Sequence, residues 1–189
     1  HGEKVGARAV RLLRLGPRRL RRGVRGLQLA AGAHLVGHVV ARAGDRVHAS
    51  AVVAQRLARR LCVACRQPYA AGEEELAMLA YEYCVDTPLN ADDTLANWRK
   101  VHAGPDGHIM LHKAQGCEEC NGSGYKGRLG VHELLINTTA VKRKIMARAN
   151  VSEITELAML EGMATLRQDG IAKVLQGYTD WEQVRAISV

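Results

Sequence analysis

The sequence of 189 residues contains no Phe, and its two Trp and five Tyr bring the aromatic content to only 4%. It also lacks an apolar run near the roughly 18 residues that a membrane-spanning helix needs, and its first residues lack the order of a secretory signal. Apolar residues nevertheless make up 47% of the chain, which excludes wholesale disorder. We therefore expect a folded cytoplasmic protein.

Motifs that bind a triphosphate are also missing. The sequence contains no GxxxxGK[ST] phosphate loop and no apolar strand ending in Asp-Glu that would hold Mg²⁺. Residues 122–127 match GxGxxG, but this stretch follows a cysteine pair and leads into a strand-like segment, whereas the dinucleotide motif opens a helix. The sequence therefore predicts no catalytic and no cofactor-binding residue.

Acidic residues are almost absent from the first third of the chain. Residues 1–60 hold 14 of the 27 Lys and Arg residues but only Glu3 and Asp45 of the 19 acids, so this part carries +12. The rest, with 13 basic and 17 acidic residues, carries −4. For the Arg-rich segment 1–49, three interpretations stay open: a solvated arm, a segment that binds nucleic acid or anionic lipid, and a stretch translated out of frame.

From Ser50 onward the patterns predict an α+β fold. We expect a helix from Ser50 to Leu61, since Val53, Leu57 and Leu61 recur every four residues. Further expected elements are a helix over 73–84, a loop over 85–107 with a short helix near 94–100, strands over 108–113 and 128–136, and helices over 139–149, 152–161, 165–176 and 179–187. In this interpretation Asn150 ends one helix, Ser152 caps the next, and Thr179 with Glu182 forms the last capping box.

Four of the five cysteines form two CxxC pairs, Cys62 with Cys65 and Cys117 with Cys120. Two such turns supply the four thiolates of a tetrahedral Zn²⁺ site of the closed, structural kind. Arg66, Lys126 and Arg128 are close enough in sequence to offset its negative charge. Two disulfides and a redox CxxC are the alternatives, disfavoured by the expected cytoplasmic location and by the absence of a thioredoxin-like context.

Other candidate ligands are weaker. We expect Cys84 to be a buried core thiol, because it falls on the apolar face of its helix. His108 and His112 share a face of a predicted strand, and either can replace a cysteine as ligand, although packing or solvent contact is favoured. His34 and His38 lie four apart without the Glu of an HExxH motif, so no catalytic metal is predicted there.

Three strings carry a resemblance to a known family. They are Ala54-Gln-Arg-Leu-Ala-Arg-Arg-Leu-Cys62 with Cys65, then residues 116–135, and then residues 161–177, which read Glu-Gly-Met-Ala-Thr-Leu-Arg-Gln-Asp-Gly-Ile-Ala-Lys-Val-Leu-Gln-Gly. Residues 50–189 thereby resemble the C-terminal end of the type II secretion and type IV pilus assembly ATPases. The resemblance implies that Cys62, Cys65, Cys117 and Cys120 correspond to the tetracysteine zinc site of that family.

The family resemblance also implies a setting. Its members are cytoplasmic motors that form hexameric rings at the inner membrane and drive pilin or pseudopilin assembly with ATP. Their zinc subdomain is associated with contacts to the membrane-embedded assembly platform. We therefore expect a homo-hexamer peripheral to the inner membrane, attached through partners, with ATP and Mg²⁺ bound only by the full-length protein.

Residues 1–49 depart from that family, because they contain neither its phosphate loop nor its acidic Mg²⁺ site. We expect a C-terminal fragment that is inactive alone, divided into the Arg-rich segment 1–49, a helix plus zinc-binding subdomain at 50–136, and a helical region at 137–189. The alternative is a zinc-ribbon nucleic-acid-binding protein with a basic arm, opposed by the −4 charge of residues 61–189 and the lack of interleaved basic and aromatic residues. A chaperone-type zinc module is a weaker alternative still. Residues 117–124 resemble the CxxCxGxG repeat of the Hsp40 co-chaperones, but the repeat occurs here only once.

Overall fold

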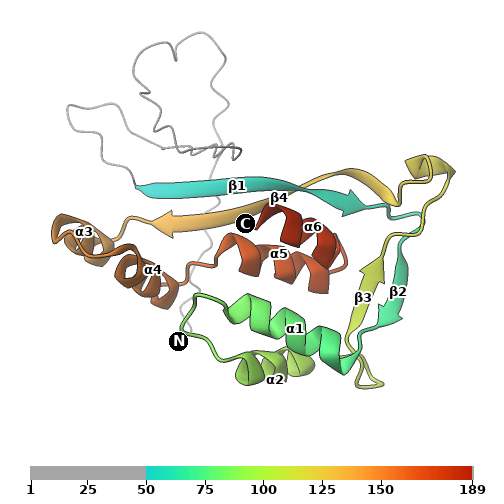
Figure 1. Cartoon of the computed structure of the whole chain (residues 1–189), viewed down its shortest axis with the longest axis horizontal. Helices are drawn as coiled ribbons and strands as arrows, with labels where there is room; N and C mark the ends of the chain where they lie inside the picture. The colour runs from blue at the N-terminus through green and yellow to red at the C-terminus, as the bar shows by residue number, and fades with distance from the viewer. Residues whose placement is uncertain (1–49, 189) are drawn as a thin grey trace, which may run out of the picture. The chain divides into compact units, whose positions relative to one another are not determined.

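A computed structural model describes residues 50–188, and the predicted α+β class is confirmed. The elements are β1 Ala51–Leu61, β2 Gln67–Ala70, α1 Glu73–Cys84, α2 Ala91–His102, β3 Met110–Lys113, η1 Glu118–Cys120, β4 Tyr125–Ile136, α3 Thr139–Met146, α4 Val151–Leu160, α5 Leu166–Leu175 and α6 Trp181–Ile187. The fold of these residues contains two antiparallel two-stranded ribbons, β1 with β4 and β2 with β3; α1 and α2 lie in the chain between β2 and β3, and α3 to α6 follow β4 (Figure 1). None of the helices in this part of the chain combines the length and apolar composition that crossing a bilayer requires.

The segment predicted as the first helix is a strand. β1 pairs antiparallel with β4 from Ala51 opposite Ile136 to Leu61 opposite Tyr125, with an irregularity between Arg59 and Leu61. The prediction was wrong because a spacing of four is also a multiple of the two-residue period of a strand, so Val53 and Leu57 share a face in either structure. The β-branched Val52-Val53 pair and the long partner β4 favour the strand.

β1 and β4 form a long outer ribbon, and β2 and β3 form a separate, short inner ribbon that runs at an angle to it (Figure 1). β2 pairs antiparallel with β3, from Gln67 opposite Lys113 to Ala70 opposite Met110, and Figure 1 shows this short ribbon beyond the end of β1 and β4. Between β2 and β3 the chain forms α1, as predicted, and α2, which is longer than predicted because Asn90 accepts hydrogen bonds from the N–H groups of Asp92 and Asp93. The outer and inner ribbons therefore meet where the two CxxC pairs stand.

The helical tail differs from its prediction mainly at the caps. Asn150 does not end α3, which stops at Met146, but accepts a hydrogen bond from the N–H of Glu153 and so begins α4 in place of Ser152. α5 agrees with its prediction, with Thr165 and Gln168 forming a capping box. For α6 the cap is Asp180, and the predicted box of Thr179 and Glu182 is wrong because the Thr179 hydroxyl is used elsewhere.

One hydrophobic core contains residues from both sides of the domain boundary expected at residue 136. Apolar side chains of α1 and α2 pack with those of α5 and α6 and of the short ribbon. The buried members are Ala71, Leu76, Leu79, Ala80, Trp98, Ile109, Leu111, Ile171, Val174, Leu175 and Val184. The residues between the two cysteine pairs thus share one core with the C-terminal helices, while the division at residue 136 stays a prediction.

The turn between α5 and α6 contacts the inner ribbon closely at one point. Gly177 is buried with φ +71°, and a Cβ there would lie 2.4 Å from Nδ1 of His112 on β3. Only glycine combines this left-handed backbone with so close an approach.

A pair of glycine variants tests this contact. Gly162→Ala, at φ +98° with nothing within 4 Å of the added Cβ, should lower the free energy of unfolding by about 1–2 kcal/mol through backbone strain alone. Gly177→Ala should lower it by about 1–3 kcal/mol more, because the Cβ also displaces His112. Urea unfolding of both variants measures the difference, and equal losses would contradict the described contact.

Candidate metal centre

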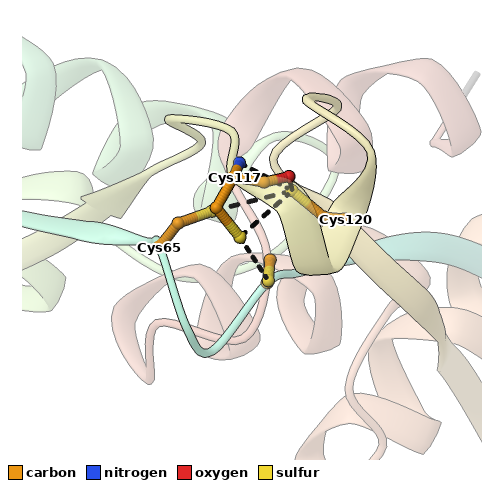
Figure 2. A group of neighbouring side chains, drawn as sticks. Cys65, Cys117 and Cys120 are labelled. Atoms are coloured by element: carbon orange, nitrogen blue, oxygen red, sulfur yellow. Dashed lines mark hydrogen bonds between the residues drawn. The ribbon is translucent and has the colours of Figure 1, made fainter.

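The four paired cysteines gather where the two ribbons meet. Cys62 and Cys65 lie in the turn that leads from β1 to β2, and Cys117 and Cys120 in the loop that leads from β3 to β4. Figure 2 shows Cys65 facing Cys117 and Cys120 across the two loops. The four sulfur atoms all lie within 4.8 Å of one another, so the structure brings together all four residues of the predicted site.

The spacing of the sulfurs is suited to a metal ion. The Sγ atoms of Cys62 and Cys117 are 3.9 Å apart, those of Cys65 and Cys120 3.8 Å, and those of Cys117 and Cys120 3.7 Å. Neighbouring sulfurs of a tetrahedral ZnS₄ centre, with Zn–S bonds of about 2.3 Å, lie about 3.8 Å apart. A disulfide would require about 2.05 Å, and all four cysteines are free. The donor set therefore fits a tetrahedral thiophilic cation.

The loops point backbone donors at one sulfur. Sγ of Cys120 accepts hydrogen bonds from the N–H groups of Cys117, at 3.1 Å, and Gly124, at 3.2 Å. Burial alone would raise the pKa of Cys120, but these donors and the neighbouring thiols lower it to about 6. For Cys65, burial raises the pKa well above its ordinary value. One thiolate is thus favoured near neutral pH, and a metal would displace the remaining protons, so metal affinity should fall as the pH falls.

The cations around the cluster differ in part from those expected. Lys126 lies beside it, pairs with Glu119 at 3.1 Å and lines a hollow next to Cys62 together with Arg60, which the sequence analysis did not select. Arg128 is opposite Arg59 in the long ribbon. Arg66 directs its guanidinium to the carbonyl of Gly177.

The remaining candidates lie outside the cluster. His108 is exposed in the turn before β3, and His112 lies against Gly177. Cys84 is only half-buried, with its sulfur 3.3 Å from Oγ1 of Thr94. Gly122 and Gly124 precede β4 and Gly127 lies within it, so this segment leads into a strand, as predicted, and not into a helix. His34 and His38 fall outside the described residues.

Sequence reasoning missed the turn that supports the cluster from the C-terminal side. Thr179 is fully buried, and its hydroxyl donates to the carbonyl of Arg59 at 2.8 Å. The sequence pattern predicts for Thr179 only a place in the cap of the last helix. Nothing in local spacing relates Thr179 to Arg59, which lies 120 residues earlier.

His112 should make stability depend on pH. Its Nδ1 is buried without a hydrogen-bond partner, and burial, followed by the charge of Arg66, lowers the pKa of His112 below the usual 6.5. Between the two pKa values the unfolded chain binds more protons than the folded one. The contribution of His112 is therefore complete above pH 6.5 and is lost as the pH falls through its lowered pKa.

Urea unfolding between about pH 5 and pH 7.5 checks this expectation. His112→Gln should flatten the fall in unfolding free energy toward low pH, and His108→Gln, at an exposed side chain before β3, serves as the matched control. Protonation of the cysteines affects all three proteins alike, so the difference between variants isolates His112. An identical pH profile for His112→Gln and the unaltered chain would refute the assignment.

Comparisons with known proteins place the chain in a family. Residues 22–186 match the sequence profile of the family described as "Type II/IV secretion system protein". The chain is 41% identical over 134 residues to the type II secretion system protein E of Dickeya dadantii, covering 70% of this chain and 22% of that protein. It is 36% identical over 138 residues to the type IV pilus assembly ATPase PilB of Thermus thermophilus, covering 73% of this chain and 13% of that protein. The chain thus spans less than a quarter of either relative, and it belongs to the type II/IV secretion system protein family.

Proposed function

We propose that this chain supplies the C-terminal, zinc-bearing part of a cytoplasmic ATPase that powers type II protein secretion or type IV pilus assembly. The family match over residues 22–186 and the names of the relatives support this class of motor. The role proposed for the described residues is that of a docking module stabilised by a structural zinc ion. Its ligands would be Cys62, Cys65, Cys117 and Cys120.

The observation that carries the proposal is the spacing of the sulfurs. Three Sγ–Sγ distances of 3.7–3.9 Å agree with the edges of a ZnS₄ tetrahedron. Four thiolates fill the coordination sphere of zinc, and a closed sphere leaves no position for a reacting water. The centre would therefore stabilise the junction of the ribbons and would not perform chemistry.

Metal content tests the zinc centre. Protein purified without chelator should contain about one zinc per chain, measured by inductively coupled plasma mass spectrometry. Cys117→Ser should lose the metal and lower the free energy of unfolding by more than about 4 kcal/mol, because three ligands remain around a broken junction. Cys84→Ser removes a cysteine outside the cluster and should keep both the bound zinc and the free energy of unfolding of the unaltered chain.

The zinc proposal has a clear contrary result. A folded chain with far less than one zinc, together with unchanged stability of Cys117→Ser, would overturn it. Loss of zinc in Cys84→Ser to the same extent as in Cys117→Ser would show that the variants act through misfolding and not through a ligand.

Hydrolysis is proposed to reside elsewhere in the motor. The sequence has no phosphate loop and no acidic Mg²⁺ strand, so ATP would be bound by the remainder of a full-length family member. There the module would join a hexameric ring and meet the inner-membrane assembly platform, which would keep the motor peripheral to the membrane. The nucleic-acid alternative depends on the basic residues 1–49, which lie outside the described part of the chain, and no described contact favours it.

The division of labour between module and motor is testable. The purified chain with saturating ATP and Mg²⁺ should release phosphate no faster than a blank, because its sequence has no phosphate loop to position the nucleotide. Cys117→Ser serves as a matched preparation, since a contaminating ATPase would give the same rate in both. A rate that copurifies with the chain and disappears in Cys117→Ser would contradict the proposal.

A further inference from the structure

The turn between α5 and α6, residues 176–180, is bound by the segments that carry the cysteines. On one side of the first pair, the N–H of Leu61 donates to the carbonyl of Tyr178 at 2.9 Å. On the other side, the guanidinium of Arg66 donates to the carbonyl of Gly177. Cys62 and Cys65 therefore stand between two hydrogen bonds to the same turn.

The same turn makes two more contacts with the long ribbon. The buried Thr179 hydroxyl donates to the carbonyl of Arg59 at 2.8 Å, three residues before Cys62. The Tyr125 hydroxyl donates to the Asp180 carboxylate. Tyr125 follows Gly124, whose carbonyl accepts from the N–H of Cys62 at 2.9 Å and whose N–H donates to the Cys120 sulfur.

The position of this turn decides where two helices lie. α5 and α6, which it connects, bring Ile171, Val174, Leu175 and Val184 into the core shared with α1 and α2. Val184 also packs on Gly170, where an added Cβ would lie 2.5 Å from its Cγ1. Anything that shifts residues 59–66 thus acts on the core through the turn.

We propose that the cysteine cluster and the 176–180 turn form one coupled unit, in which metal binding holds the C-terminal helices in place and Arg66 and Thr179 act as positioning residues for the metal. This inference rests on the zinc binding proposed above and adds to it a role for residues that offer no ligand atom. The segment 59–66 is the shared element, since its sulfurs face the metal position and its backbone and Arg66 hold the turn.

Coupling of this kind is reciprocal. If the metal orders segment 59–66 and so favours the docked turn, then the docked turn must favour the metal by the same factor. A variant that loosens the turn should therefore weaken metal binding, although no thiol has changed. A turn that is only a structural neighbour would affect stability without changing metal affinity.

Zinc affinity of the full chain, measured by competition with a chromophoric chelator, tests the coupling. Thr179→Val keeps the shape of the side chain and removes the donor to Arg59, and Arg66→Gln removes the guanidinium at Gly177. Each should weaken zinc binding about fivefold to fiftyfold, within the range usual for coupled sites. The matched controls Thr155→Val on α4 and Arg185→Gln on α6 alter residues away from the turn and should bind zinc as the unaltered chain does.

Hydrogen exchange on the unaltered chain provides a test without variants. Removal of zinc by a chelator should increase exchange at residues 176–187 as well as at residues 61–66, while residues 139–146 of α3 serve as the internal reference. Unchanged exchange at 176–187, or zinc affinities of both turn variants within twofold of the unaltered chain, would overturn the coupling. If the unaltered chain holds one zinc, such results refute the coupling alone; a chain that binds no zinc refutes both proposals.

Discussion

The arrangement of this protein depends on the convergence of two CxxC turns on one point. Cys65 and Cys117 are separated by the inner ribbon and two helices, yet all four sulfurs meet within 4.8 Å. Residues 66–116 form the excursion between the two cysteine pairs, and chain entropy opposes bringing its ends together. The pairing of β1 with β4 and of β2 with β3, on either side of the cluster, offsets this cost. The thiols therefore stand at the one place where both ribbons end.

This convergence gives the excursion and the C-terminal helices a common core. The two-stranded ribbons are too narrow to bury a hydrophobic core by themselves. Trp98 and Leu79 from the excursion instead pack with Ile171 and Val184 from the tail. A metal at the junction would thus stabilise the shared core as well as the two CxxC turns, because α5 and α6 are attached next to the cluster.

Local pattern predicted some elements well and failed at others for definable reasons. The α1 helix and the α5 capping box follow from residues close in sequence, and both agree with the structure. The segment Ala51–Leu61 was predicted as a helix because its apolar spacing fits both periods, and only the pairing with β4 decides for a strand. Asn150 was predicted to end α3 but caps α4, because it lies between these two helices. Thr179 was predicted to cap α6, but Asp180 does so, and the Thr179 hydroxyl donates to the distant Arg59.

The α+β class, the family and the four thiols of the candidate site could be predicted from the sequence, because residue identity alone carries the paired CxxC spacing and the long motifs. The distances between the sulfurs, which suit a tetrahedral ion, emerge only from the folded arrangement. The same is true of the hydrogen bonds by which Arg66 and Thr179 hold the 176–180 turn against residues 59–66. These two contacts join residues 111 and 120 positions apart. Sequence does not reveal them, because a hydrogen bond depends on where the packed chain places its donor and acceptor.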